Sequence, residues 1–180
     1  MHNDVHPLID QPSAWVQRWS PRIPPAGRVL DVACGSGRHA RWLAARGHPV
    51  EAVDRDAAAV SGFAGIPGIT TRVADLESET WPYAGGHFAG IVVVNYLHRP
   101  LLPLLLAALA PGGVLIYETF AVGNERYGRP SNPDFLLKPG ELLQVVHGRL
   151  EVIAYESLMV EVPRPAVVQR LCALNGAVTR

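Results

Sequence analysis

The sequence predicts a single-domain, doubly wound α/β fold (Rossmann-like) on a mostly parallel seven-stranded sheet that ends in an antiparallel hairpin. Three observations lead to this prediction. Short apolar runs alternate with stretches of helical spacing over residues 28–120, a glycine-rich turn follows the first run, and two strand-like runs close the chain with a short turn between them. Alternating strands and helices are typical of parallel sheets with right-handed crossovers. A connection as short as the last one permits only antiparallel pairing.

Size and composition favour one neutral domain. The 180 residues include 16 Lys and Arg and 16 Asp and Glu, so the formal net charge is zero, and 48% of the residues are hydrophobic. That hydrophobic share argues against disorder, and the zero charge argues against a nucleic-acid substrate. No apolar run is long enough for a signal or membrane segment, which predicts a cytoplasmic protein without a membrane partner. Cys34 and Cys172 lie far apart and form no metal-spaced pair, so no metal is expected.

The N-terminal region differs from the rest of the chain. Residues 1–27 are rich in proline and polar groups, and we expect a mobile arm there, with the folded domain at 28–180. Within the arm, residues 12–19 are predicted to form a short helix capped by Ser13. Three prolines that follow would prevent this helix from continuing.

The apolar pattern then predicts the regular elements of the domain. Strands are expected at 28–33, 48–53, 69–74, 88–94, 114–118, 149–162 and 166–174. Helices are expected around 40–47, 55–63, 101–110 and 139–146. Between them, residues 119–138 form a long loop rich in Gly, Pro and Asn, and loops of that length are usually functional or disordered.

A glycine-rich turn, Cys34-Gly35-Ser36-Gly37, follows the first strand and precedes a helix. This arrangement places backbone N–H groups and a helix N-terminus at the carboxyl edge of the sheet, where open α/β folds bind ligands. Glycine lets a ligand approach the backbone because it has no Cβ. On its own, the pattern also fits an ordinary tight turn.

Two acidic residues at neighbouring strand ends strengthen the prediction of a ligand site. Asp54 ends the second strand, 19 residues after Gly35, where a carboxylate can accept both hydroxyls of a ribose. Asp75 ends the third strand and would lie near the same edge. Either acid could instead cap a helix or occupy a turn. Their occurrence together with the glycine turn favours the binding site.

These motifs resemble those of the class I S-adenosylmethionine-dependent methyltransferases. The resemblance rests on residues 29–38, 53–56, 74–77, 88–95 and 109–115. One departure is Ala33, because many members of the family carry glycine at that position. Within the family, residues 34–38, the Asp75-Leu76 pair and residues 135–142 look like the small bacterial group related to tellurite-resistance methyltransferases.

The resemblance implies S-adenosylmethionine as the cofactor and a set of residues that contact it. These residues are Asp31, Cys34, Gly35, Ser36, Gly37, Arg38, Asp54, Arg55, Asp75, Leu76 and Asn95. The acid of the first strand and the glycine turn would hold the methionine part, and the acid of the second strand would hold the ribose. Asp75 would accept the adenine amino group, and the Leu76 backbone would meet a ring nitrogen. Asn95 would lie beside the sulfonium, and Arg38 would either pair with the methionyl carboxylate or remain exposed at the helix start.

Acceptor-side candidates follow the fourth and fifth strands. Tyr96 and His98 leave the fourth strand at the edge where the methyl group should lie, so they are candidates for acceptor contacts or a general base. Tyr96 could instead pack and His98 could cap or solvate a loop. Glu118 and Thr119, at the end of the fifth strand, could contact the acceptor or be structural.

Two other segments could cover the site. The 119–138 loop carries Arg126, Tyr127, Arg129 and Lys138 and could close as a lid that suits an anionic acceptor, or it could be a plain solvated loop. In the N-terminal arm, Trp15 and Trp19 could cover the cofactor or pack on the edge of the sheet.

The sequence therefore predicts a methyltransferase that acts on a small-molecule acceptor by in-line displacement. One alternative is a non-catalytic S-adenosylmethionine-binding sensor or partner subunit. Another is a nicotinamide-dinucleotide-binding protein, because residues 35–40 also fit the G-x-G-x-x-A pattern. Against this second alternative, Asp31 interrupts the first strand, Asp75 has no role in such a site, and the chain has little room for a separate catalytic domain.

Overall fold

The computed structural model describes residues 11–85 and 87–176. The strands are β1 (Val29–Val32), β2 (Val50–Asp54), β3 (Ile69–Val73), β4 (Phe88–Val94), β5 (Leu109–Phe120), β6 (Glu151–Val160) and β7 (Ala166–Leu174). The α-helices are α1 (Ala14–Trp19), α2 (Arg38–Ala44), α3 (Ala57–Ser61), α4 (Leu102–Ala107) and α5 (Glu141–Val146). Short 3₁₀ helices add η1 (Ser20–Arg22), η2 (Arg99–Leu101), η3 (Asn124–Arg126) and η4 (Pro133–Phe135).

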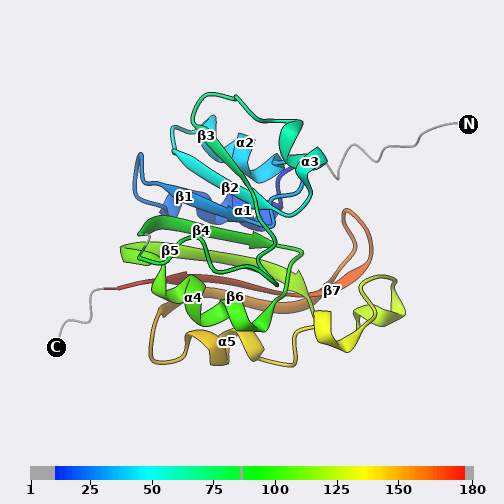
Figure 1. Cartoon of the computed structure of the whole chain (residues 1–180). Helices are drawn as coiled ribbons and strands as arrows, with labels where there is room; N and C mark the ends of the chain where they lie inside the picture. The colour runs from blue at the N-terminus through cyan, green and yellow to red at the C-terminus, as the bar shows by residue number, and fades with distance from the viewer. Residues whose placement is uncertain (1–10, 86, 177–180) are drawn as a thin grey trace, which may run out of the picture.

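The strands form one seven-stranded sheet in the order β3-β2-β1-β4-β5-β7-β6 (Figure 1). Strands β1 to β5 are parallel to one another, whereas β7 is antiparallel to both β5 and β6. The predicted doubly wound α/β sheet with a C-terminal antiparallel hairpin is therefore confirmed. Because the β1-to-β5 strands share one direction, their carboxyl ends meet at one edge of the sheet.

Two hydrophobic cores cover the faces of this sheet. Leu30 and Val32 of β1 enter the core beneath α4 and α5, and Val29 enters the core beneath α1, α2 and α3. Successive side chains of a strand point to opposite faces. A strand such as β1, buried on both faces, therefore has the nearly continuous apolar sequence from which it was predicted.

Strand β5 begins earlier than the prediction of 114–118. Leu109 already pairs with Phe88 of β4, and the register then shifts before Val114 pairs with Gly90. The Pro-Gly-Gly turn that was expected to precede the strand lies within this irregular pairing. The turn is therefore part of the sheet.

The N-terminal segment is packed over residues 11–27, so the expectation of a mobile arm is wrong there; residues 1–10 lie outside the described residues. The capped helix is confirmed, because the Ser13 side chain accepts a hydrogen bond from the Trp15 backbone N–H. The indole of Trp15 is 3% exposed and donates to the Leu171 carbonyl at 3.2 Å. Its ring meets Trp19 edge-on at 5.6 Å, so these residues pack on the sheet.

His39 anchors the N-terminal segment from α2. Its Nε2 atom accepts a hydrogen bond from the Ser13 backbone N–H at 3.1 Å. Burial of the imidazole, helped by the nearby Arg38 charge, lowers the pKa of His39 from 6.5 to about 3. The folded protein thus keeps this histidine neutral over a range in which the unfolded chain binds a proton.

We predict that His39 makes the fold less stable as the pH falls from 6.5 toward 3. In that window the unfolded state binds one more proton at this residue, so the free energy of unfolding decreases by up to about 1.4 kcal/mol per pH unit. His39→Gln retains an acceptor for Ser13 and should remove this contribution. Urea unfolding across the window should show a growing stability difference between the variant and the parent, and His87→Gln, at an exposed position, should show none. A constant difference for His39→Gln would contradict the prediction.

Candidate functional site

The carboxyl edge of the sheet holds a cavity of about 410 Å³, here named the strand-end cavity. Six of the residues predicted to form the site line it, namely Asp54, Arg55, Asp75, Leu76, Asn95 and Tyr96. They come from the ends of β2 and β4 and from the segment after β3. Residues far apart in the sequence are thus brought together by the parallel order of the strands.

Asp54 is held in one orientation by two backbone N–H groups. The Gly35 N–H donates to its Oδ2 at 2.8 Å, and the Asp56 N–H donates to its Oδ1 at 2.9 Å. A carboxylate oxygen can accept more than one hydrogen bond. Asp54 can therefore accept two further donors side by side, as a vicinal diol requires.

The glycine turn leaves space next to this carboxylate. Gly35 has a φ of +53°, and a Cβ at this position would meet nothing within 4 Å. Gly37, with a φ of +75°, has a different role, because a Cβ there would lie 2.7 Å from the Phe63 ring. Open space at Gly35 is the property expected of backbone that a ligand approaches. Ser36, between the two glycines, is exposed.

Two residues at the strand ends have left-handed backbone although they are not glycine. Ala33, with a φ of +52°, follows β1, and Asn95, with a φ of +58°, follows β4. Such backbone is unfavourable for alanine and tolerated by asparagine. The left-handed backbone at position 33 thus explains why glycine suits this position. Ala33 and Asn95 both line the strand-end cavity.

Asp31 is a buried acid with one oxygen left without a partner. It is 1% exposed, and its carboxylate accepts a hydrogen bond from the Ala40 backbone N–H in the first turn of α2. Burial raises the pKa of Asp31 to about 7. Among the described residues, its Oδ2 atom has no hydrogen-bond partner. Buried polar atoms normally have one, so a cationic donor bound beside the turn would complete this site.

Cys34 does not direct its side chain into the strand-end cavity. The thiol belongs to the core beneath α1, α2 and α3, and the residue is 6% exposed. Burial and the nearby Asp31 and Asp54 carboxylates raise the pKa of the Cys34 thiol. Only the backbone of this residue is therefore available to a ligand.

Asp75 remains ionised at the far end of the cavity. The Glu77 N–H donates to its Oδ1 at 3.0 Å and the Ser78 hydroxyl to its Oδ2 at 2.9 Å. These two hydrogen bonds, with further help from the charges of Arg55 and His98, lower the pKa of Asp75. The carboxylate is an acceptor at neutral pH.

Tyr96 and His98 lie on the Asp75 side of the site. Burial, together with the Glu77 and Asp75 carboxylates, raises the pKa of Tyr96, which therefore keeps its proton and is poorly suited to be a general base. His98 begins η2 and is close enough to Asp75 to lower the pKa of that acid. Tyr96 lines the strand-end cavity, and neither residue lines the second cavity described below, so their place on the acceptor side stays a prediction.

A second cavity of about 800 Å³ lies between the α1 segment and the tip of the β6–β7 hairpin. This hairpin groove shares Asn95 and Phe120 with the strand-end cavity. It also contains Arg38 and Glu118, both predicted from the sequence. Sequence analysis did not single out Ser13, Arg164 and Arg170 as lining residues, and no local motif marks them, because they meet only in the folded chain.

Glu118 joins the two walls of the hairpin groove. The Ser13 hydroxyl donates to its Oε1 at 3.0 Å, and Arg170 on β7 donates to its Oε2 at 2.5 Å. Arg170 also pairs with Glu156 at 3.3 Å. The charges of Glu118 and Arg170 are thus already compensated. Thr119, the next residue, is buried and lines the strand-end cavity instead.

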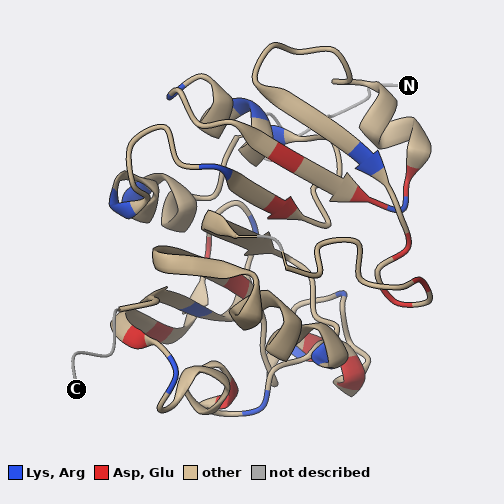
Figure 2. Ribbon diagram, turned by 60° about the vertical axis from the view of Figure 1, so that its left-hand side comes forward, with Lys and Arg blue, Asp and Glu red and all other residues tan. Residues whose placement is uncertain are grey.

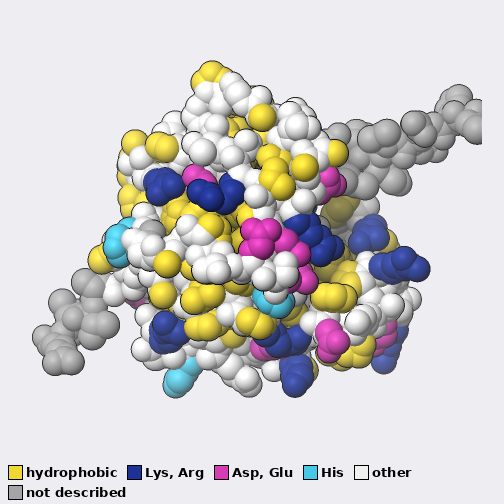
Figure 3. All heavy atoms as spheres, in the orientation of Figure 1, with side chains coloured by type: hydrophobic (Ala, Val, Ile, Leu, Met, Phe, Trp, Pro, Cys, Tyr) yellow, Lys and Arg dark blue, Asp and Glu magenta, His cyan; other side chains and the backbone are white. Residues whose placement is uncertain are grey.

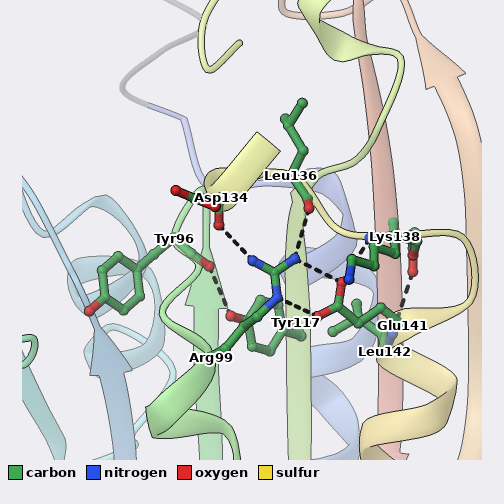
Figure 4. A network of polar contacts seen from close by, with 9 residues as sticks. Tyr96, Arg99, Tyr117, Asp134, Leu136, Lys138, Glu141 and Leu142 are labelled. Atoms are coloured by element: carbon green, nitrogen blue, oxygen red, sulfur yellow. Dashed lines mark hydrogen bonds and ion pairs between the residues drawn. The ribbon is translucent and has the colours of Figure 1, made fainter. Parts of the chain in front are cut away.

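The 119–138 loop is ordered around Arg99 (Figure 4). The guanidinium donates to both Glu141 carboxylate oxygens, at 2.7 and 3.0 Å, and to the carbonyls of Asp134 and Leu136, at 2.7 and 2.9 Å. This network fixes η4, so that Phe135 lines the strand-end cavity. The loop residues expected to attract an anion line neither cavity; they are Arg126, Tyr127, Arg129 and Lys138.

We predict that Arg99→Ala frees this loop without unfolding the sheet. The variant loses hydrogen bonds between charged groups and leaves Glu141 with the Lys138 backbone N–H but without its ion-pair partner, which should lower stability by about 2 kcal/mol. Amide hydrogen exchange should become faster in residues 133–141 and remain unchanged in β1 and β4. Arg126→Ala, at an exposed position of the same loop, is the matched control. Equal protection of residues 133–141 in Arg99→Ala and the parent would show that the network does not hold the loop.

Charges of both signs are spread through the described part of the molecule. Figure 2 shows blue and red segments interspersed along the ribbon, and in Figure 3 acidic and basic side chains stand close together around a hollow. Within residues 11–85 and 87–176, no three His, Cys, Asp or Glu side chains are grouped to hold a metal ion. The described helices are also too short or too polar to cross a membrane.

Comparison with known proteins gives both family and fold. Residues 5–149 match the family model described as a methyltransferase domain. Trans-aconitate 2-methyltransferase of Paracidovorax citrulli is 34% identical over 102 residues, which are 52% of this chain and 38% of that protein. A tRNA U34 carboxymethyltransferase of Alcanivorax borkumensis is 35% identical over 107 residues, 53% of this chain and 33% of that protein. The match thus covers only 38% and 33% of the lengths of these two curated relatives.

A solved structure extends the likeness over most of the chain. TehB from Haemophilus influenzae superposes with a TM-score of 0.72 and 18% identity, covering 89% of this chain and 61% of that one. At this identity the likeness concerns the fold. The family model, in contrast, covers well over half of the sequence. The chain therefore belongs to the methyltransferase-domain family, in keeping with the resemblance of its motifs to the class I S-adenosylmethionine-dependent methyltransferases.

Proposed function

We propose that this protein transfers a methyl group from S-adenosylmethionine to a small-molecule acceptor. The observation that carries the proposal is the fixed Asp54 carboxylate beside the open Gly35 backbone, at the rim of the strand-end cavity. A paired acceptor of this kind suits the ribose hydroxyls of the cofactor. The adjoining hairpin groove supplies the space for an acceptor, which favours an enzyme over a binding module.

In this proposal, different residues of the chain bind different parts of the cofactor. Asp31 offers its unpartnered oxygen to the methionyl ammonium, and Arg38, which lines the hairpin groove, pairs with the methionyl carboxylate. Asp75 accepts the adenine amino group beside the Leu76 backbone. Asn95 lines both cavities and so marks the place where cofactor and acceptor meet.

The cofactor supplies a reactive methyl group on a sulfonium, so the protein needs mainly to align it with a nucleophile. Holding two reactants in line is worth up to about 7–11 kcal/mol in favourable cases. A general base is required only where the acceptor must lose a proton. A site whose tyrosine keeps its proton is therefore compatible with methyl transfer.

A small-molecule acceptor is favoured over a nucleic acid by charge. The sequence carries no net charge, and nucleic-acid affinity depends on Lys and Arg that neutralise phosphates. The tRNA-modifying relative aligns with only part of this chain. Binding of a radiolabelled tRNA pool at physiological salt would contradict this part of the proposal.

The decisive experiment separates cofactor binding from catalysis. Thermal shift with S-adenosylmethionine, S-adenosylhomocysteine and NAD in parallel should show stabilisation by the first two only. Methyl transfer from labelled S-adenosylmethionine is then measured with thiol, hydroxyl, amine and carboxylate acceptors. Stabilisation by NAD alone would contradict the cofactor assignment, and cofactor binding without any methylated product would favour the non-catalytic alternative.

A further inference from the structure

The hairpin groove has apolar walls. Phe120 and Val168 contribute buried side chains, Val160 is partly exposed, and Val162 at the hairpin tip is 67% exposed. Water-exposed apolar surface of this kind is stabilised when it is covered by an apolar ligand body. This part of the groove therefore fits the apolar portion of a ligand, beside polar and charged residues elsewhere in the lining.

The charged residues that line the groove have a positive excess. Arg38, Arg164, Arg170 and Glu118 line it; outside the lining, Glu156 also pairs with Arg170, and the Asp31 carboxyl lies near enough to Arg38 for this charge to lower its pKa. Arg170 and Glu118 compensate each other. A cationic ligand would thus enter a positively charged lining and find the carboxylate already bonded, whereas an anionic ligand would be attracted.

Arg164 is the guanidinium placed to meet an anion in this groove. It is exposed on the hairpin tip, its carbon lies 5.7 Å from the centre of the Phe120 ring, and one nitrogen donates to the Arg129 carbonyl at 3.0 Å. No carboxylate of the described residues forms an ion pair with it. A guanidinium has five N–H donors, so donors remain for a planar anion.

We propose that the hairpin groove takes an organic anion with an apolar body as the methyl acceptor, and that Arg164 determines this selectivity by binding the anionic group. This inference rests on the proposed methyltransferase function. Phe120 lies beneath the guanidinium and also lines the strand-end cavity, so an acceptor held at Arg164 extends toward the cofactor. The sequence suggested that cations of the 119–138 loop would bind an anionic acceptor; we assign this role to Arg164 on the hairpin instead.

The test uses three ligands with one apolar body and different end groups. The full-length protein, saturated with S-adenosylhomocysteine, is titrated with 4-phenylbutyrate, 4-phenylbutan-1-ol and 4-phenylbutylamine by calorimetry or ligand-observed NMR. We expect the carboxylate to bind about tenfold more tightly than the alcohol, since one charge-assisted contact distinguishes them, and the amine to bind most weakly.

Arg164→Gln should lower the affinity for phenylbutyrate about tenfold, to that of the alcohol, without changing the affinities for the alcohol or S-adenosylhomocysteine. Arg164→Glu should reverse the order so that the amine binds best. Arg126→Gln, which removes an exposed arginine outside the groove, should leave all values unchanged.

An unchanged preference for the carboxylate in Arg164→Gln, equal binding of carboxylate and amine to the parent, or no binding of any of the three ligands would overturn the inference. Failure of the parent to bind S-adenosylhomocysteine in the first titration would instead refute the proposed function. The two failures are therefore read from different measurements.

Discussion

Replacing Asp54 with alanine should lower the affinity for S-adenosylhomocysteine by about 10²-fold or more. The variant loses both acceptors proposed for the ribose, and hydrogen bonds to a charged group contribute about 1.5–3 kcal/mol each. The loss also removes the acceptors of the Gly35 and Asp56 N–H groups, which fix the glycine turn against β2. Calorimetric titration of the folded variant measures the effect directly.

Asp56→Ala is the matched control for this prediction. Asp56 lies two residues further on and caps α3, accepting hydrogen bonds from the backbone N–H groups of Ala58 and Ala59 at 2.9 and 3.1 Å. Its loss should reduce stability by about 1 kcal/mol while the protein still binds S-adenosylhomocysteine. If Asp54→Ala also bound with near-parental affinity, the ribose would have been placed at the wrong carboxylate.

Asp31→Asn should change stability and cofactor affinity in opposite directions. The pKa of Asp31 is 3.8 in the reference state and about 7 in the folded protein, raised by burial. Its favourable contribution is complete below pH 3.8 and is lost as the pH rises through 7, because the folded state must then bury a charge that the Ala40 N–H and Arg38 compensate only in part. Above pH 7 the asparagine variant should be more stable by as much as about 4 kcal/mol, an upper bound from the size of the shift.

The same substitution removes the anion proposed to meet the methionyl ammonium, so affinity for S-adenosylhomocysteine should fall at least about tenfold. Asparagine retains an oxygen for the Ala40 N–H, whereas Asp31→Ala does not and should gain less stability. Urea unfolding above pH 7 and near pH 3.8, together with calorimetry, tests both parts. An asparagine variant that is less stable than the parent above pH 7 would contradict the assignment of the buried charge.

The strand-end cavity, proposed for the cofactor, was predictable because its signals are local. Gly35, Asp54 and Asp75 each stand directly at the end of an apolar run, and parallel strand order alone brings such ends together. The same reasoning predicted the hairpin from the short link between β6 and β7. Distances within the site, in contrast, could be obtained only from the three-dimensional structure.

The hairpin groove, proposed for the acceptor, was less predictable because it depends on contacts between distant residues. Ser13 meets Glu118 across 105 positions, and the Trp15 indole reaches Leu171 across 156. Proline content suggested a mobile arm, but the burial of Trp15 and Val16 offsets the cost of ordering it.

The direction of the chain after β4 also could not be predicted from the sequence. Left-handed backbone at Asn95 and a hydrogen bond from the Tyr117 hydroxyl to the Tyr96 carbonyl, at 2.9 Å, turn this segment toward Asp75. Tyr96 consequently lies beside the acids of the cavity. A strand-end position predicts that a residue is near the site, but the local turn decides which part of the site it reaches.

Ser13 links three parts of the structure through a single residue. Its backbone N–H meets His39, its hydroxyl oxygen caps α1, and the same hydroxyl donates to Glu118. One wall of the groove therefore shares no strand with the sheet and is held to it by hydrogen bonds and by the packing of buried side chains such as Trp15. Under the proposed function, substitutions in this segment would reshape the groove for the acceptor and leave the strand ends proposed for the cofactor as they are.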